Sequence, residues 1–178
     1  MNTPFGNSIT TAEHAIALMF SLARRIPQAS KSTHSGKWEK SKFMGSELFG
    51  KTLGLIGCGR IGSIVANRAI GLKIKVIAFD PFLSHESAKE IFESYEENDD
   101  SLRNSDYISL HTPLTETTKN IINKESINKM KTGICIINCA RGGLIDEKDL
   151  LEDLNKGKIS GAALDVFTDE PAHENILF

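Results

Sequence analysis

Residues 52–62 read Thr-Leu-Gly-Leu-Ile-Gly-Cys-Gly-Arg-Ile-Gly, and this stretch decides the fold. Its short apolar run predicts a buried strand over residues 52–56, because a glycine-rich turn follows at once. Residues 61–72 have the pattern of a helix, and residues 74–79 form a second apolar run. A strand, a helix and a strand in this order form a βαβ unit, whose two strands lie parallel in one sheet.

Further apolar runs of strand length extend this alternation at residues 107–110, 134–138 and 159–164. Between the last two runs, Asp146 is a good N-cap for a helix that ends near Gly157. Leu150, Leu151 and Leu154 are expected on its inner side. The pattern therefore predicts an α/β fold of the Rossmann type, with a doubly wound parallel sheet.

Two segments, one on each side of this unit, have a less regular pattern. The acidic stretch from residue 84 to residue 105 predicts a short helix and an exposed connection. Residues 30–47 are polar and basic but contain Trp38, Phe43 and Met44. These three side chains allow two interpretations, a surface arm that packs on its own domain or a subunit contact.

A long helix is expected from Thr10, because Thr10 and Glu13 have the spacing of a capping box. Pro27 is expected to end it. The helix is apolar on more than one face, so we expect it to be central to the domain or shared with a partner subunit.

The three glycines of the turn suit a phosphate-binding loop between a strand and a helix. Gly57 allows a tight turn, Gly59 lets the backbone approach a pyrophosphate, and Gly62 allows close packing of the helix. Asp80 ends the next strand, where the adenosine ribose of a dinucleotide is expected. A carboxylate there would bind the ribose hydroxyls of NAD and repel the 2′-phosphate of NADP. These residues predict binding of NAD rather than NADP. The alternative interpretation is a tight turn followed by a surface aspartate.

Arg141 follows the strand at residues 134–138, at the sheet edge where open parallel sheets bind ligands. An arginine followed by Gly142 and Gly143 is suited to bidentate capture of a carboxylate. Asp165 and Glu170 follow the last strand. From the pattern alone, Arg141 also suits a surface ion pair and Glu170 a solvated loop.

The sequence His111-Thr112-Pro113 closes another strand at the same edge, either as a wall of the nicotinamide site or as a simple proline turn. His173 lies close to Glu170 in sequence, but this spacing is weak evidence for a dyad. Cys135 and Cys139 are expected to be core thiols, and no metal site is predicted.

Composition excludes several classes of protein. The 178 residues carry 21 basic and 23 acidic side chains, so charge gives no reason to expect nucleic-acid binding. The longest apolar stretch is too short for a membrane-spanning helix, and the N-terminus lacks a secretory pattern. Three cysteines form no even set, which favours a reducing, cytoplasmic location.

Taken together, the motifs resemble the cofactor domain of the D-isomer-specific 2-hydroxyacid dehydrogenases. The resemblance covers nearly all of the chain. Its pieces are Asn2-Thr3-Pro4, Gly6-Asn7-Ser8, residues 36–39, 42–45, 50–54, 57–62, 111–114, 138–143 and 161–167, and Glu170-Pro171. Within the family, Lys37-Trp38-Glu39 and Lys42-Phe43-Met44-Gly45 are typical of the branch that acts on 3-phosphoglycerate.

The resemblance implies how NAD would be held. Arg60 and Ile61 would contact the pyrophosphate beside the three glycines, and Asp80 would bind the ribose diol. The nicotinamide half would lie against Thr112 and the backbone of Cys139-Ala140-Arg141, with Asp165 at its carboxamide end.

The resemblance also implies the chemistry of the substrate. Arg141 would hold the substrate carboxylate and polarise the C2 oxygen, and Asn7 would contact the substrate. Glu170 would hydrogen-bond a catalytic histidine and raise its pKa. In the family that histidine lies in a Thr-Pro-His element beyond Glu170, and the 178 residues contain no such element.

We therefore expect a fragment, with a hinge at residues 1–9 and an NAD-binding domain at residues 10–178. It is expected to bind NAD without turnover and to pair as a homodimer or higher homo-oligomer. The parent activity implied is oxidation of 3-phospho-D-glycerate to 3-phosphohydroxypyruvate in serine biosynthesis. The alternatives are a glyoxylate or hydroxypyruvate reductase of the same family and an NAD-sensing, corepressor-like module.

Overall fold

The computed structural model describes residues 6–80 and 100–178. The expected hinge at residues 1–9 lies partly outside these ranges. Most of the acidic stretch at residues 84–105 also lies outside them. The described end of that stretch contains a short helix, α5 (Asp100–Asn104).

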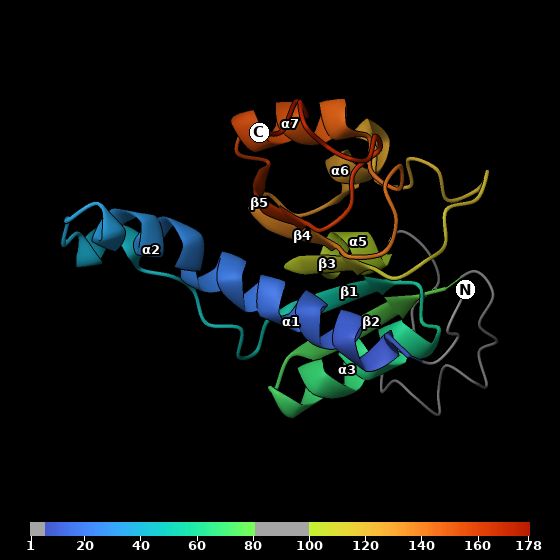
Figure 1. Cartoon of the computed structure of the whole chain (residues 1–178). Helices are drawn as coiled ribbons and strands as arrows, with labels where there is room; N and C mark the ends of the chain where they lie inside the picture. The colour runs from blue at the N-terminus through green and yellow to red at the C-terminus, as the bar shows by residue number, and fades with distance from the viewer. Residues whose placement is uncertain (1–5, 81–99) are drawn as a thin grey trace.

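A parallel sheet of five strands forms the centre of the described part (Figure 1). The strands are β1 (Thr52–Ile56), β2 (Lys75–Phe79), β3 (Tyr107–Leu110), β4 (Ile134–Asn138) and β5 (Ile159–Leu164). Their order is β2-β1-β3-β4-β5, so β1 has its successor β2 on one side and β3 on the other. The predicted doubly wound Rossmann-type sheet is confirmed, and the order reverses between β1 and β3.

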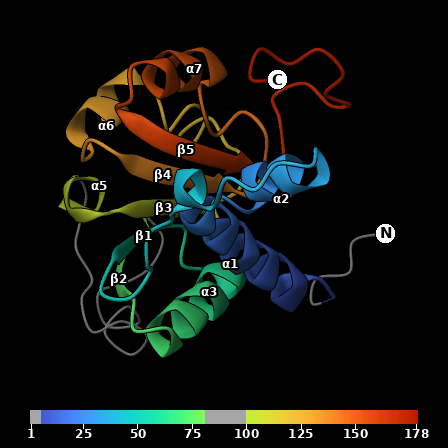
Figure 2. The same cartoon turned by 90° about the vertical axis from the view of Figure 1, so that its left-hand side faces the viewer.

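Helices cover both faces of this sheet (Figures 1 and 2). On one face, α1 (Ser8–Arg24) and α3 (Arg60–Gly71) pack on a core that includes Leu53, Leu55 and Ile137. On the other face, α5, α6 (Lys124–Lys129) and α7 (Glu147–Asn155) cover a second core that includes Ile108 and Ile136. Alternate residues of one strand point to opposite cores, which explains the continuous apolar runs.

The N-terminal helix differs from the prediction at both ends. It begins at Ser8 with Asn7 as its N-cap, so the expected capping box of Thr10 and Glu13 is wrong. It ends at Arg24, because Arg25 takes a left-handed conformation with φ of 52°. Pro27 does not end the helix but lies in the first turn of the next one, where its missing N–H costs nothing.

The polar and basic segment at residues 30–47 is called the basic arm below. It contains the end of that second helix, α2 (Ile26–His34), and a 3-10 turn, η1 (Lys40–Phe43). Figure 1 shows α2 extending beyond the end of α1. Trp38 is 82% exposed and Met44 is 77% exposed, so these two do not pack on their own domain. Only Phe43 is half-buried.

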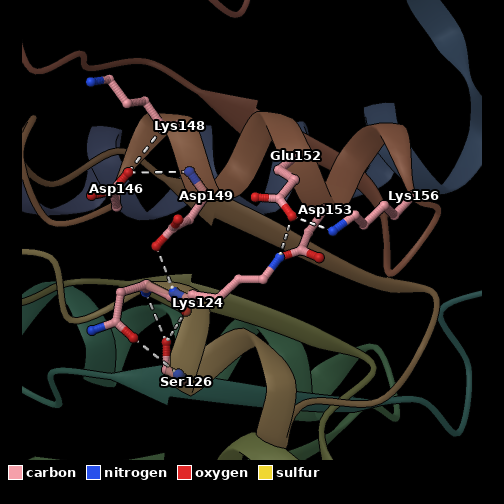
Figure 3. Close-up of polar contacts among 9 residues, drawn as sticks. Lys124, Ser126, Asp146, Lys148, Asp149, Glu152, Asp153 and Lys156 are labelled. Atoms are coloured by element: carbon pink, nitrogen blue, oxygen red, sulfur yellow. Dashed lines mark hydrogen bonds and ion pairs between the residues drawn. The ribbon is translucent and has the colours of Figure 1, made fainter.

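The α6–α7 pair is joined by polar contacts that the sequence patterns did not predict (Figure 3). Asp146 caps α7, as predicted, by accepting from the N–H groups of Lys148 and Asp149. The Lys124 Nζ lies 3.0 Å from Asp153 Oδ2 and 3.0 Å from Glu152 Oε1. Within the described ranges, no helix is long and apolar enough to span a bilayer.

Candidate functional site

The carboxyl ends of four strands and the first turn of α1 enclose a cleft of about 690 Å³. Each wall segment follows directly after β1, β3, β4 or β5, as expected for a doubly wound sheet. The lining residues are Asn7, Ser8, Thr11, Gly59, Arg60, Ile61, His111, Thr112, Pro113, Cys139, Ala140, Arg141, Asp165 and Val166. Nine of the predicted site residues therefore meet in one place: Asn7, Gly59, Arg60, Ile61, Thr112, Cys139, Ala140, Arg141 and Asp165.

The glycine turn has the geometry of a phosphate-binding loop. Gly57 has φ of 96°, and a Cβ there would lie 2.6 Å from the carbonyl carbon of His111. A Cβ on Gly62 would lie 2.2 Å from the Gly57 oxygen, so both positions require glycine. A Cβ on Gly59 would meet no heavy atom within 4 Å. Gly57 and Gly62 thus build the turn, whereas Gly59 leaves open space beside it.

The N-terminus of α3 points its N–H groups out of this turn. The helix begins at Arg60 with Gly59 as its N-cap, and no side chain caps it. Over its 12 residues, the helix presents a partial positive charge and hydrogen-bond donors to an anion at this end. The open space at Gly59 and these donors fit the diphosphate of a dinucleotide.

Asp80 lies directly beside the same loop, although it does not line the cleft. Its Oδ2 accepts a hydrogen bond of 2.7 Å from the N–H of Cys58. A carboxylate has several acceptor sites, which suits it to accept from ribose hydroxyls as well as from a backbone N–H. Burial, with Asp80 as the second cause, raises the pKa of the Cys58 thiol to about 12, so this thiol stays protonated.

The turn after β4 is shaped by Asn138, a residue to which the sequence patterns assigned no role. Its side chain is buried, with Oδ1 accepting from the N–H of Ala140 and Nδ2 donating to the Arg141 oxygen. An asparagine at the end of a buried strand was the available signal. Burial, followed by Asp165, raises the pKa of the adjacent Cys139 thiol to about 12.

Arg141 is exposed at the rim of the cleft, and its Nη1 donates to the Ala140 oxygen at 2.6 Å. A guanidinium has five N–H donors, so this bond leaves others for a carboxylate. Asp165 follows β5, and its N–H donates to the Asn138 oxygen at 3.0 Å, which continues the sheet. Its carboxylate lies 3.7 Å from His14 Nε2, a contact that we did not predict.

His111 lies beneath the loop, with its Nε2 2.9 Å from Ser109 Oγ. Its Nδ1 is buried, and among the described residues no group bonds to it. Burial lowers the pKa of this imidazole to about 4, so the ring is neutral at pH 7. A neutral ring next to the loop adds no charge that would change the site's preference for an anion.

Glu170 does not line the cleft, and its Oε1 accepts from the N–H of Phe167 at 3.0 Å. The weak expectation of a dyad with His173 gains no support, because among the described residues no hydrogen bond or ion pair joins the Glu170 carboxylate to the His173 ring. The described residues contain no group of three or more His, Cys, Asp or Glu side chains suited to a metal.

Comparison with known proteins agrees with this geometry. Residues 16–178 match the model for "D-isomer specific 2-hydroxyacid dehydrogenase, NAD binding domain". The chain is 51% identical to D-3-phosphoglycerate dehydrogenase of Bacillus subtilis over 99% of its own length and 34% of that protein. It is 48% identical to hydroxypyruvate reductase of Thermotoga maritima, covering 99% of this chain and 56% of that one.

Among solved structures, D-lactate dehydrogenase with NAD⁺ from Lactobacillus jensenii superposes with a TM-score of 0.84. The two sequences are 35% identical, and the match covers 97% of this chain and 52% of that one. The chain spans only about a third of the length of the phosphoglycerate dehydrogenases that it matches.

Proposed function

Because the chain belongs to the D-isomer specific 2-hydroxyacid dehydrogenase family as its NAD-binding domain, we propose that it serves a D-3-phosphoglycerate dehydrogenase. The reaction is oxidation of 3-phospho-D-glycerate to 3-phosphohydroxypyruvate, the first step of serine biosynthesis. The likeness to phosphoglycerate dehydrogenases from several organisms, at about half identity over almost the whole chain, supports this substrate.

One observation supports the redox role above all: the phosphate loop and Arg141 line the same cleft. The loop residues Arg60 and Ile61 would hold the diphosphate, and Asp80 would hold the adenosine ribose. Thr112, the Cys139-Ala140-Arg141 backbone and Asp165 would hold the nicotinamide half. Bound there, NAD supplies the hydride acceptor.

The residues of this chain would prepare the substrate for hydride loss. Arg141 would bind the substrate carboxylate bidentately and polarise the oxygen on C2. These contacts would hold the substrate with C2 facing the cofactor cleft. Asn7, the N-cap of α1, lines the same cleft and would add a polar contact to the substrate. Glu170 orients the histidine that takes the hydroxyl proton and favours its charged form.

A reductase acting on hydroxypyruvate or glyoxylate is the second candidate. The hydroxypyruvate reductase of Thermotoga maritima is almost as similar to this chain as the phosphoglycerate dehydrogenases are. Both candidates use the same cofactor cleft, so the difference lies in the groups that recognise the substrate's phosphate.

Initial-rate assays of the enzyme that contains this domain separate the two. We expect NADH formation with 3-phospho-D-glycerate at a higher kcat/KM than any turnover of glyoxylate or hydroxypyruvate with NADH. The reverse order would assign the chain to the reductases. Binding of NADH by the isolated domain, followed by NADH fluorescence, tests the cofactor role independently of turnover.

We further propose a homodimer in the cytoplasm. Trp38 and Met44 on the basic arm, together with Phe49, expose large apolar surfaces that a second copy would cover. The cytoplasmic location rests on three cysteines that are all free, with Cys58 and Cys139 buried.

A further inference from the structure

The segment that carries Glu170 is a closed loop. It follows Asp165 and returns on itself, because the rings of Phe167 and Phe178 meet edge to face with their centroids 5.3 Å apart. Glu170 lies between these two rings in sequence and bonds to the N–H of Phe167. Whatever fixes the main chain at Phe167 and Thr168 therefore also fixes Glu170.

One side chain outside the loop reaches both of its arms. Glu147, in the first turn of α7, accepts a bond of 2.8 Å from the N–H of Thr168 through Oε1. Its Oε2 accepts a bond of 2.7 Å from Asn175 Nδ2. Asn175 Oδ1 in turn accepts from the N–H of Leu177 at 2.9 Å. The bonds from Thr168 and Asn175 both end on the Glu147 carboxylate, and a hydrogen bond to a carboxylate is stronger than one between neutral groups.

The turn after β4 supports the loop from another direction. A Cβ on Gly142 would lie 1.7 Å from the Phe167 oxygen, so the two backbones touch. Gly142 is next to Arg141, and Glu147 lies five positions further on. The segment from residue 141 to residue 147 thus carries one candidate catalytic residue and holds the loop that carries the other.

We propose that Glu147 is a positioning residue that sets Glu170 relative to Arg141. This role rests on the proposed function, in which Glu170 orients the histidine that takes the substrate's proton. Two consecutive backbone N–H groups link the two glutamates. The N–H of Phe167 donates to Glu170, and the N–H of Thr168 donates to Glu147. Without Glu147, the loop loses two hydrogen bonds to α7, one on each arm.

Cofactor binding does not depend on this attachment. Glu147 does not line the cofactor cleft. Asp165, which precedes the loop and lines the cleft, is held separately by the bond of its N–H to the Asn138 oxygen. The proposal therefore separates two effects: removal of Glu147 impairs the chemical step and leaves NAD binding intact.

The test compares Glu147→Ala, Glu147→Gln and Glu174→Ala in the enzyme that contains this domain. Glu174 lies in the same loop, is exposed and forms no hydrogen bond or ion pair with a described residue, so it is the matched control. We expect Glu147→Ala to lower kcat by about tenfold to a hundredfold, the cost of a small misplacement. The dissociation constant for NADH stays within about twofold of the wild-type value, well under the tenfold that corresponds to about 1.4 kcal/mol.

Two further readouts separate positioning from general damage. A displaced Glu170 stabilises the charged form of the catalytic histidine less, so the pKa of that histidine falls. The acid limb of the pH dependence of kcat for 3-phospho-D-glycerate oxidation therefore moves to lower pH in Glu147→Ala. Glu147→Gln keeps an oxygen that accepts from Thr168 and gives an intermediate kcat. In the isolated domain, hydrogen exchange of the Thr168 amide becomes faster in Glu147→Ala and stays unchanged in Glu174→Ala.

An unchanged kcat in Glu147→Ala, with Glu170→Gln strongly impaired, overturns the positioning role and leaves the proposed function standing. Equal losses of kcat and NADH affinity also overturn it, since they indicate general damage. A wild-type enzyme that forms no NADH with 3-phospho-D-glycerate and reduces no hydroxypyruvate overturns the proposed function, and the positioning role falls with it. The wild-type rate distinguishes the two failures.

Discussion

The N–H of Cys58 in the phosphate loop donates to the carboxylate of Asp80 at 2.7 Å, across 22 residues of sequence. This bond fixes a negative charge beside the loop, where the 2′-hydroxyl of an adenosine ribose is expected. A 2′-phosphate at the same place would meet that charge. We therefore expect this relationship to favour NAD over NADP.

We expect the domain to bind NADH at least about tenfold more tightly than NADPH, a difference of about 1.4 kcal/mol. Asp80→Ser should reduce this ratio, because the repulsion disappears while a hydroxyl remains to bond the ribose. Calorimetric titration of both variants with both nucleotides gives the ratio. Equal affinities in the wild-type domain would refute the role of Asp80.

Gly57 and Gly59 should respond differently to alanine. Gly57→Ala should destabilise the fold, because its φ is positive and its Cβ would overlap the His111 backbone. Gly59→Ala should leave the melting temperature nearly unchanged and lower NADH affinity by tenfold or more, or about 1.4 kcal/mol. Its Cβ would occupy the open space that suits a diphosphate.

Gly71→Ala is the matched control for Gly59→Ala, since a Cβ there also meets nothing within 4 Å and lies at the far end of α3. Thermal unfolding and NADH fluorescence are measured on the same samples. A Gly59→Ala domain that binds NADH as well as the control would contradict the assignment of this space to the cofactor.

His111 should make the domain less stable in acid. Its pKa is lowered by burial from 6.5 to about 4, so between these values the unfolded chain binds a proton that the folded chain does not. The contribution to stability is therefore full above pH 6.5 and declines as pH falls towards 4, by an amount on the order of 3 kcal/mol.

Denaturant unfolding of the wild type and His111→Asn at pH 7 and pH 4.5 measures this contribution. The wild type should lose more stability than the variant over this interval, and carboxylates that titrate in both proteins cancel in the comparison. Equal losses would show that the imidazole is not held neutral by burial.

The ion pairs of α6 and α7 should differ in importance. Lys124 contacts Asp153, which is 3% exposed, whereas the ion pair of Lys156 within the described ranges is with the exposed Glu152. Lys124→Ala leaves a buried carboxylate without its charged partner and should lower the melting temperature by several degrees. Lys156→Ala should have little effect, because exposed pairs contribute little. The reverse order in a thermal scan would contradict the network shown in Figure 3.

The exposed arm predicts self-association. Light scattering should show a dimer for the wild-type domain, and Trp38→Glu should shift it to a monomer without changing NADH affinity. Lys40→Glu, which changes charge on the same arm without removing apolar surface, is the control. A monomeric wild-type domain at high concentration would contradict the dimer.

The strands could be predicted from the sequence almost to the residue, because strands buried on both faces form continuous apolar runs. The polar helices could not. Helix α6 has only Ile127 buried, so its signal lies in the capping box of Asn123 and Ser126 and not in an apolar pattern. Helix α2 has no buried residue, so periodicity gave no sign of it.

The residues of the candidate site also differ in how far the sequence predicts them. Local spacing places the glycine loop, and the strand ends place Thr112, Arg141 and Asp165, because chain order dictates where parallel strands end. The role of Asn138 also depends on local contacts, because its side chain bonds to Ala140 and Arg141, two and three residues away. The role of Glu147 could not be predicted in this way, since its bonds to Thr168 and Asn175 form only when α7 and the loop after β5 come together.

The central claim is that a dinucleotide diphosphate rests on the N-terminus of α3 with its adenosine ribose at Asp80. A crystal structure of the domain with NAD⁺ tests it most directly. We predict density for the diphosphate against Gly59, Arg60 and Ile61 and for the ribose hydroxyls within hydrogen-bond distance of Asp80. Coenzyme density elsewhere, with this cleft empty, would contradict the account.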